Sequence, residues 1–387
     1  MSHQGRREYL KRIWERYKNA DLKTKGLILT EFCAVCGYNR KYAIRLLSKG
    51  HRHEPKRSGR KAIYGPDLLL HLRELWFWME QLSAVRMKRA LWLWLKYYTK
   101  AADGTPCTEA QKRQLRKMSA STIGRYLKEF RSQKGVSGTK TNWALKHKIP
   151  IEILNYKIQK PGAIQADTVL HCGNKIAGEY AHSLTMTDIA SGWTENRAIW
   201  TKDAKQVRDQ IRAIESSLPF HMHWFATDCG NEFLNHHVMT YLTLRRKPVH
   251  LSRSRPYHKD DNAFSEQKNW THVRGLFGYD RIDQRELIPL MNEIYEKYWN
   301  PLHNFFFPSL KLVSKEIVNK KIKKKFDVPK TPAQRLLESE HLSIRQKRNL
   351  RLRYKQLNPF ELKTEMEKKL KSFYRILRQS QISRIAA

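Results

Sequence analysis

The first fifty residues place apolar side chains at helical spacing on otherwise polar and basic segments. Two of these segments, 24–35 and 39–47, are separated by a short turn that contains Gly37. Helix, glycine-containing turn and helix is the pattern typical of a helix-turn-helix. We therefore predict a helix-turn-helix domain over residues 1–50. The polar side chains that its second helix leaves outward are Arg40, Lys41 and Arg45.

A similar pattern returns after a polar segment. Residues 51–65 are basic and contain glycine and proline, which indicates a linker. Residues 66–132 are again helical in period and predict a second helix-turn-helix domain, with Thr122 and Arg125 on the outward side of its last helix. Residues 133–160, rich in Gly, Ser, Lys and Thr, are expected to form a second linker.

From about residue 161 the pattern changes from helical to strand-like. The expected strands are 163–171, 180–187, 193–200, 222–227 and 248–251, and the expected helices are 203–218, 233–244 and 263–277. This order of elements indicates a mixed α/β domain, which we place at 161–305. A basic C-terminal region, 306–387, follows. The fold class predicted is therefore multidomain, with two all-α units ahead of an α/β core.

Charge narrows the choice of partner. The 387 residues contain 75 Lys and Arg against 36 Asp and Glu, a formal net charge of +39. Such an excess destabilises a compact chain by self-repulsion unless a polyanion is a normal partner. Nucleic acid is the default polyanion, well ahead of an anionic membrane surface, and the helix-turn-helix patterns favour double-stranded DNA. The DNA contacts expected on this ground are Arg40, Lys41, Arg45, Arg57, Arg60, Lys61, Thr122 and Arg125.

The same composition argues against other classes of protein. No apolar run reaches the roughly 18–20 residues that span a bilayer, and the N-terminal segment lacks the apolar stretch of a secretory signal. Five cysteines are too few and too scattered for a disulfide scaffold. We expect a cytoplasmic, nucleoid-associated protein with no membrane partner and no small-molecule cofactor.

Three acidic residues stand where a basic protein has no structural need for them. Asp167 interrupts an apolar strand, where a carboxylate costs several kcal/mol unless it is paired or bound to metal. Asp228 ends another apolar strand at a loop, as active-site groups in α/β sheets often do. Glu266 shares helical spacing with Trp270 and Val273, so we expect its side chain to point toward the sheet.

Three carboxylates at one sheet edge suit Mg²⁺ or Mn²⁺, which prefer oxygen ligands. Two such ions could clamp the attacking and leaving oxygens of a phosphoryl displacement, so we predict two ions held by Asp167, Asp228 and Glu266. Asp260 and Asp261 compete for the third position, but they lie in a polar loop and rank below Glu266. We interpret Glu232 as an acid at the start of a helix.

These residues carry a resemblance to a known family. The segment 228–233 (DCGNEF) resembles the stretch around the second acid of retroviral-integrase-like transposase cores, and 256–269 (PYHKDDNAFSEQKN) resembles the loop and helix that carry the third. Asp167 fits the first acid, and 188–192 (DIASG) is similar to the hairpin after the first strand. With its helical modules and basic tail, the chain resembles bacterial insertion-sequence transposases of the DDE type.

The resemblance implies an RNase H-like fold and a DNA-cleaving, DNA-joining enzyme that acts as a homo-oligomer on element ends and target DNA. Water attacks a phosphodiester at the element's end, and the freed 3′-OH then attacks a target phosphodiester.

The chain departs from the family's pattern near the third acid. Between Asp228 and Glu266 lie 37 residues, close to the family's commonest spacing but not equal to it. The often basic or polar positions four and seven after Glu266 are Trp270 and Val273. We take Lys268 and Arg274 as the nearest DNA contacts. The residues expected to support the acids are His258, Asn262 and Asn269.

Other interpretations stay open. A non-catalytic DNA-binding regulator could retain a transposase-like core, and a nuclease of RNase H-like fold would use the same acids. A zinc site from Cys33, Cys36, His51 and His53 is the weaker interpretation of the CxxC motif, because that motif falls at the end of an expected helix.

Overall fold

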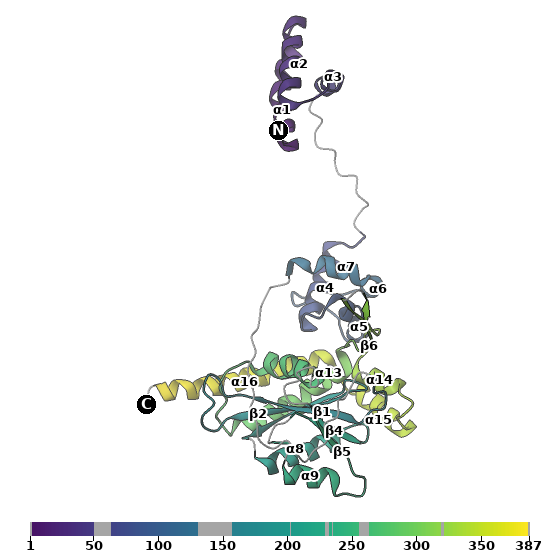
Figure 1. Cartoon of the computed structure of the whole chain (residues 1–387), viewed down its shortest axis with the longest axis vertical. Coiled ribbons are helices and arrows are strands. Elements are labelled where there is room, and N and C mark those ends of the chain that lie inside the picture. The colour runs from purple at the N-terminus through teal and green to yellow at the C-terminus, as the bar shows by residue number, and fades with distance from the viewer. Residues whose placement is uncertain are drawn as a thin grey trace. The chain divides into compact units, whose positions relative to one another are not determined.

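The computed structural model describes residues 2–49, 63–130, 157–201, 203–228, 232–233, 235–254, 263–318 and 321–385. The chain divides into two compact units, Met1–Tyr64 and Gly65–Ala387 (Figure 1). The domain boundaries predicted at residues 132, 160 and 305 all lie inside the second unit. Among the described residues no helix is long and apolar enough to cross a membrane.

The first unit is a three-helix assembly. Its helices are α1 (His3–Asn19), α2 (Leu22–Cys36) and α3 (Arg40–Lys49). Gly37 ends α2 in the left-handed region at φ 68°, and its N–H donates to the carbonyl of Cys33 at 2.8 Å. Phe32, Ala43 and Leu47 are buried between the helices. The expected helices and the glycine break are therefore present.

The second unit begins with a helical part. It contains α4 (Pro66–Trp78), α5 (Ala84–Trp94), α6 (Glu109–Lys117), α7 (Ala120–Tyr126) and the short helix η1 (Lys128–Phe130). Trp94 is fully buried, and its Nε1 donates to the carbonyl of Phe306 at 3.2 Å. Arg86 Nε donates to the carbonyl of Pro308 at 2.6 Å. These bonds tie the helical part to the C-terminal half of the same unit.

A five-stranded mixed sheet forms the centre of the second unit. Its strands are β1 (Ala163–Leu170), β2 (Ala181–Asp188), β3 (Thr194–Trp200), β4 (Trp224–Thr227) and β5 (His250–Arg253), in the spatial order β3-β2-β1-β4-β5. The strands β1, β2 and β3 pair antiparallel, while β4 and β5 run parallel to β1. All five expected strands are present, which confirms the prediction of a mixed α/β domain.

Helices cover both faces of this sheet (Figure 1). On one side lie α8 (Ala204–Ser217) and α9 (His236–Thr243), whose N-caps are Asp203 and Asn235. The other helices of the core are α10 (Ala263–Lys268), the π-helix η3 (Asn269–Arg274), α11 (Gly275–Phe277), α12 (Leu287–Glu293), the π-helix η4 (Ile294–Trp299) and α13 (Asn300–Phe306). The pattern of the sequence did not predict α12 to α13.

Asparagine side chains cover the edge strand β3. Asn292 exchanges two hydrogen bonds with the backbone of Ala198, at 2.7 and 3.0 Å. Asn304 does the same with Thr194, at 2.9 Å for both bonds, and Asn300 Oδ1 accepts from the N–H of Asn196 at 3.2 Å. These bonds satisfy backbone groups that an edge strand otherwise leaves open for pairing.

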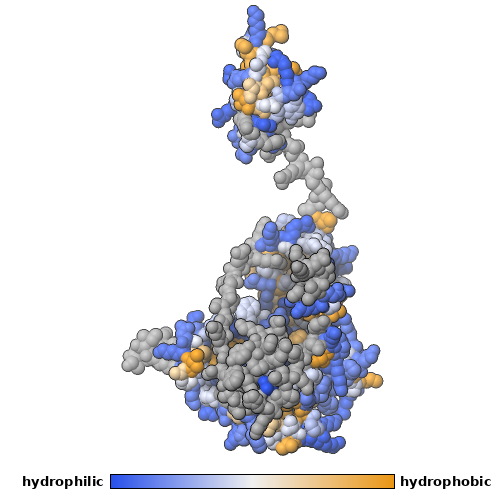
Figure 2. All heavy atoms as spheres, in the orientation of Figure 1, coloured by the Kyte–Doolittle hydropathy of each residue, from blue (hydrophilic) through white to orange (hydrophobic). Residues whose placement is uncertain are grey.

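The C-terminal region is folded rather than a solvated tail. Its elements are β6 (Leu312–Val318), β7 (Lys321–Phe326), α14 (Pro332–Glu338), α15 (Ile344–Lys355) and α16 (Pro359–Ile385). Phe373 of α16 packs on Phe277 with ring centroids 4.9 Å apart, and Lys363 Nζ donates to the carbonyls of Phe77 and Trp78. On the face shown in Figure 2, the described surface is mostly hydrophilic.

Candidate active site

The first two predicted acids lie on neighbouring strands, Asp167 inside β1 and Asp228 directly after β4. In the parallel pair of β1 and β4, Ala166 stands opposite Thr227. Asp167 and Asp228 are the next residues along each strand, so the register brings them side by side. The sequence predicted that each acid belongs to a strand, and the pairing of these two strands brings the acids close together.

Asp167 is held by hydrogen bonds on both carboxylate oxygens. Its Oδ1 accepts from the N–H of Thr168 at 2.8 Å, and its Oδ2 accepts from Asn269 Nδ2 at 2.6 Å. Burial raises the pKa of Asp167, and the negative charges of Asp228 and Glu266 raise it further. Asp228 and Glu266 therefore both act on Asp167 through their charge.

Glu266 departs from the expected orientation. Its side chain is exposed to solvent, whereas the helical stripe predicted a buried position. The reason is the π-helix η3, which begins three residues later and shifts the phase of the helix. Trp270 is consequently 54% exposed, while Val273 and Phe277 are fully buried. The helical stripe read from the sequence is therefore broken between Trp270 and Val273.

The start of this helix is fixed on the strand that carries Asp167. Gln165 Oε1 accepts from the backbone N–H groups of Phe264 and Ser265, at 3.1 Å in both cases. Gln165 is buried two residues before Asp167. This contact fixes the position of the first turn of α10, which contains Glu266. Even so, within the part of the chain that the structure describes, no three His, Cys, Asp or Glu side chains are arranged to hold a metal ion.

One acid of this neighbourhood was assigned a different role from the sequence. Glu232 is only 5% exposed, and its Oε1 accepts from Thr168 Oγ1 at 2.5 Å. It lies in a turn before Asn235, the N-cap of α9, so its interpretation as a helix-start acid was wrong. The signal available in the sequence was its place in the segment 228–233, four residues after Asp228.

Of the predicted supporting and DNA-binding residues of the core, Asn269 contacts an acid, whereas Lys268 and Arg274 contact other groups. Asn269 contacts Asp167 directly. Lys268 is half-buried, its Nζ lies 3.4 Å from His272 Nε2, and burial lowers its pKa to about 7. Arg274 donates to the carbonyl of Leu170 at 2.8 Å and stacks over Tyr279. The DNA contacts of Lys268 and Arg274 stay predictions.

The remaining predicted residues lie on other helices or outside the described residues. Arg40, Lys41 and Arg45 are exposed on α3, as expected. On α7, Arg125 is exposed, whereas Thr122 is half-buried with its hydroxyl 2.9 Å from Ser119 Oγ. The predicted residues outside the described ones are Arg57, Arg60, Lys61, His258, Asn262, Asp260, Asp261, His51 and His53. Cys36 is buried and Cys33 half-buried in α2, and both are free thiols.

A relative places the chain in a family. Over 336 residues it is 30% identical to the uncharacterized protein y4rM of Sinorhizobium fredii, a match that covers 85% of this chain and 94% of that protein. The chain belongs to the y4rM family. Any continuous stretch covering 85% of the chain includes the residues from Asp167 to Glu266, so the candidate site lies within the part shared with y4rM.

Other comparisons add less. No family model matches the chain. A solved structure, the cryo-EM structure of the simian T-cell lymphotropic virus intasome in complex with PP2A regulatory subunit B56 gamma, matches 44% of this chain and 56% of that chain at 14% identity and a TM-score of 0.28. A likeness of this size is too slight to support a conclusion about fold or function.

Proposed function

We propose that the chain is a DDE-type transposase with an RNase H-like core, which cleaves DNA at element ends and joins the freed 3′-OH to target DNA. The observation that carries the proposal is the register of the parallel strands β1 and β4, which brings Asp167 beside Asp228. The negative charge of Glu266 also acts on Asp167. A structural role does not explain why a protein of net charge +39 gathers carboxylates that repel one another.

The donor set fits divalent cations. All three side chains are carboxylates, which offer the oxygen ligands that Mg²⁺ and Mn²⁺ prefer. The negative charges of Asp228 and Glu266 raise the pKa of Asp167, and a bound cation would offset this repulsion. Asp167 and Asp228 would hold the ions, and the exposed Glu266 would complete the set by rotating its side chain. When bound, two divalent ions neutralise phosphate charge and lower the pKa of water.

The chain's own residues prepare this site. Asn269 fixes Asp167 Oδ2, and Gln165 fixes the helix of Glu266 on β1. Glu232 accepts from the hydroxyl of Thr168, next to Asp167, which adds further negative potential. In the proposed cycle, water forms a new P–O bond and releases a 3′-OH, which then displaces a 3′-oxygen from a target phosphodiester. Basic residues of both units hold the DNA, and the enzyme acts as a homo-oligomer near the nucleoid.

The test uses the full chain with duplex DNA that carries the sequences flanking its gene. With Mg²⁺ or Mn²⁺ we expect nicks at one end of a repeat, and with a second duplex we expect joined products. Chelation of the metal should stop both reactions. Intact DNA under all of these conditions, with binding retained, would contradict the proposal.

A non-catalytic regulator remains the second candidate, because Glu266 is exposed and the described acids form no complete metal site. A thermal melt separates the two. A catalytic core binds Mn²⁺ in its folded state, so Mn²⁺ at about 100 times its Kd should stabilise the protein by about 2.7 kcal/mol. The Asp167→Asn variant should show little of this shift. A regulator without a metal site should melt at the same temperature with and without Mn²⁺.

Asn269 offers a prediction for a residue outside the triad. Asn269→Asp replaces the donor to Asp167 by another carboxylate, which removes a hydrogen bond and adds repulsion. We expect nicking to fall roughly 10- to 100-fold, the usual effect of removing a group that orients a metal ligand. The activity should partly return at higher Mn²⁺ concentration. Thr271→Asp, on the same helix and bonded only to backbone carbonyls, is the control.

A further inference from the structure

The strands β6 and β7 pair only with each other in the part of the chain that the structure describes. They form a two-stranded antiparallel sheet separate from the five-stranded sheet (Figure 1). The described side chains of its outer part, from Val313 to Glu316 and from Lys323 to Phe326, are exposed, with Ser314 half-buried. An isolated two-stranded hairpin is only marginally stable in water. We call the two strands, Leu312–Val318 and Lys321–Phe326, the ribbon.

Positive charge on the ribbon is concentrated and uncompensated. The exposed lysines are Lys315, Lys323, Lys324 and Lys325. Lys315 stands directly opposite Lys324, and like charges in that position destabilise a strand pair. Glu316, opposite Lys323, is the acid on the described part. Among the residues that the structure describes, none of these lysines takes part in an ion pair.

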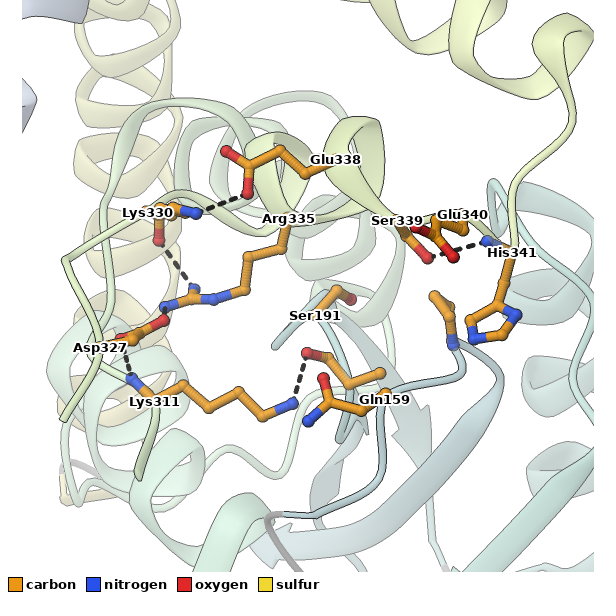
Figure 3. A pocket seen from close by; sticks show the side chains of 12 residues that line it. Gln159, Ser191, Lys311, Asp327, Lys330, Arg335, Glu338, Ser339, Glu340 and His341 are labelled. Atoms are coloured by element: carbon orange, nitrogen blue, oxygen red, sulfur yellow. Dashed lines mark hydrogen bonds and ion pairs between the residues drawn. The ribbon is translucent and has the colours of Figure 1, made fainter. Parts of the chain in front are cut away.

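The base of the ribbon, in contrast, is firmly anchored to the core (Figure 3). The backbone of Lys311 bonds Asp327 in both directions, at 2.7 Å to its Oδ1 and 2.9 Å from its N–H. Arg335 of α14 donates to Asp327 Oδ2 at 2.9 Å. Lys311 Nζ donates to the carbonyls of Ile158 and Ala190, at 3.0 and 2.9 Å.

A cavity of about 340 Å³ lies at this base. Its lining cations Lys311, Lys330 and Arg335 already bond the protein's own carbonyls and carboxylates. We therefore interpret the cavity as part of the anchor. The structure thus combines an anchored base with an outer part whose described side chains are charged and mostly exposed.

We propose that the ribbon is a DNA-binding arm that lies against duplex DNA, with its lysines on the phosphates. A two-stranded ribbon fits the major groove, and phosphates placed near Lys315 and Lys324 would relieve the repulsion between them. The inference deepens the proposed function, since it takes DNA as the substrate, and it assigns a contact surface that is distinct from the acids.

The test compares two triple variants of the full chain that lose the same charge. The first is Lys323→Ala, Lys324→Ala and Lys325→Ala. The matched control is Lys205→Ala, Arg212→Ala and Lys247→Ala, which removes exposed cations from α8 and the loop before β5. Affinity for a labelled duplex is measured by fluorescence anisotropy at several salt concentrations, with EDTA present so that no DNA is cut.

We expect the ribbon variant to bind roughly 10- to 100-fold more weakly at low salt. Its plot of log K against log salt should be less steep by about 2–3, because each lost phosphate contact changes the slope by about 0.9. The control should keep the wild-type slope. Equal losses in both variants, or none in the ribbon variant, would overturn the inference.

A second measurement does not depend on variants. Duplex DNA should protect Lys323, Lys324 and Lys325 of the wild-type protein from chemical acetylation, and should leave Lys205 and Lys247 reactive. Protection by anionic vesicles but not by DNA would overturn the proposal and indicate a membrane surface. Both measurements are made without divalent metal, so they test the DNA-binding ribbon separately from the proposed transposase activity. A protein that never cuts DNA can still pass them, and an active transposase can fail them.

Discussion

Asp167→Asn and Asp228→Asn should each lower the rate of DNA nicking by about 10³-fold, while DNA binding stays at the wild-type level. Each substitution removes a charged oxygen ligand from the proposed metal site, and divalent ions supply several kcal/mol of transition-state stabilisation. The Asp167→Asn variant should fold well, because Asn removes a half-buried carboxylate that Asp228 and Glu266 repel. Glu266→Gln should have a similar effect on nicking.

The experiment measures initial nicking rates on one labelled duplex with Mg²⁺ and with Mn²⁺, alongside binding and thermal melts. Asp209→Asn is the control, since Asp209 is an exposed acid of α8 that pairs with the neighbouring Arg208. It should nick DNA at the wild-type rate. If the Asp167 and Asp228 variants are as active as this control, the site assignment is wrong and other acids must be sought.

Gly162→Ala should destabilise the second unit by about 3–5 kcal/mol, which combines backbone strain with overpacking. Gly162 precedes β1 at φ 111°, and a Cβ at this position would lie 2.1 Å from the carbonyl oxygen of His221. The neighbour is backbone, so it cannot move aside as a side chain would. Gly162 is also held on both sides, by Asp188 Oδ1 at 2.7 Å and by the N–H of His223 at 2.9 Å.

Chemical denaturation followed by tryptophan fluorescence checks this expectation. Gly275→Ala is the matched control, because Gly275 is helical and an added Cβ would find its nearest atom at 3.6 Å. The control should be as stable as the wild type or slightly more stable. If the free energy of unfolding of Gly162→Ala lies within about 1 kcal/mol of the wild-type value, the prediction is wrong. The backbone around Gly162 would then be able to relax around the added Cβ.

The elements of the core follow closely from the sequence. Alternating and helical periods placed the five strands and the helices α8 and α9, because each period reports which side of an element is buried. The same pattern singled out Asp167 and Asp228, since a charge inside or at the end of an apolar strand contradicts its surroundings. Those predictions depend on residues near one another in the chain, where local preferences are strong.

Other features of the structure could not be predicted from local sequence patterns. The helical stripe through Glu266 assumes 3.6 residues per turn, and the π-helix from Asn269 to Arg274 changes that period. The ribbon was missed because lysines predict strands poorly, and its base is fixed by Arg335 from another helix. The contact between Glu232 and Thr168 joins residues 64 positions apart.

Periodicity and charge along the chain are enough to predict a basic protein with helical modules, an α/β core and two acids inside or directly after apolar strands. Strand pairing shows in addition that the two strands are parallel neighbours, with Ala166 opposite Thr227. The fold also shows that Glu266 is exposed and that a lysine-rich segment forms a ribbon. Periodicity records whether a side chain is buried, whereas strand register, helix phase and anchoring depend on contacts between residues far apart in the chain.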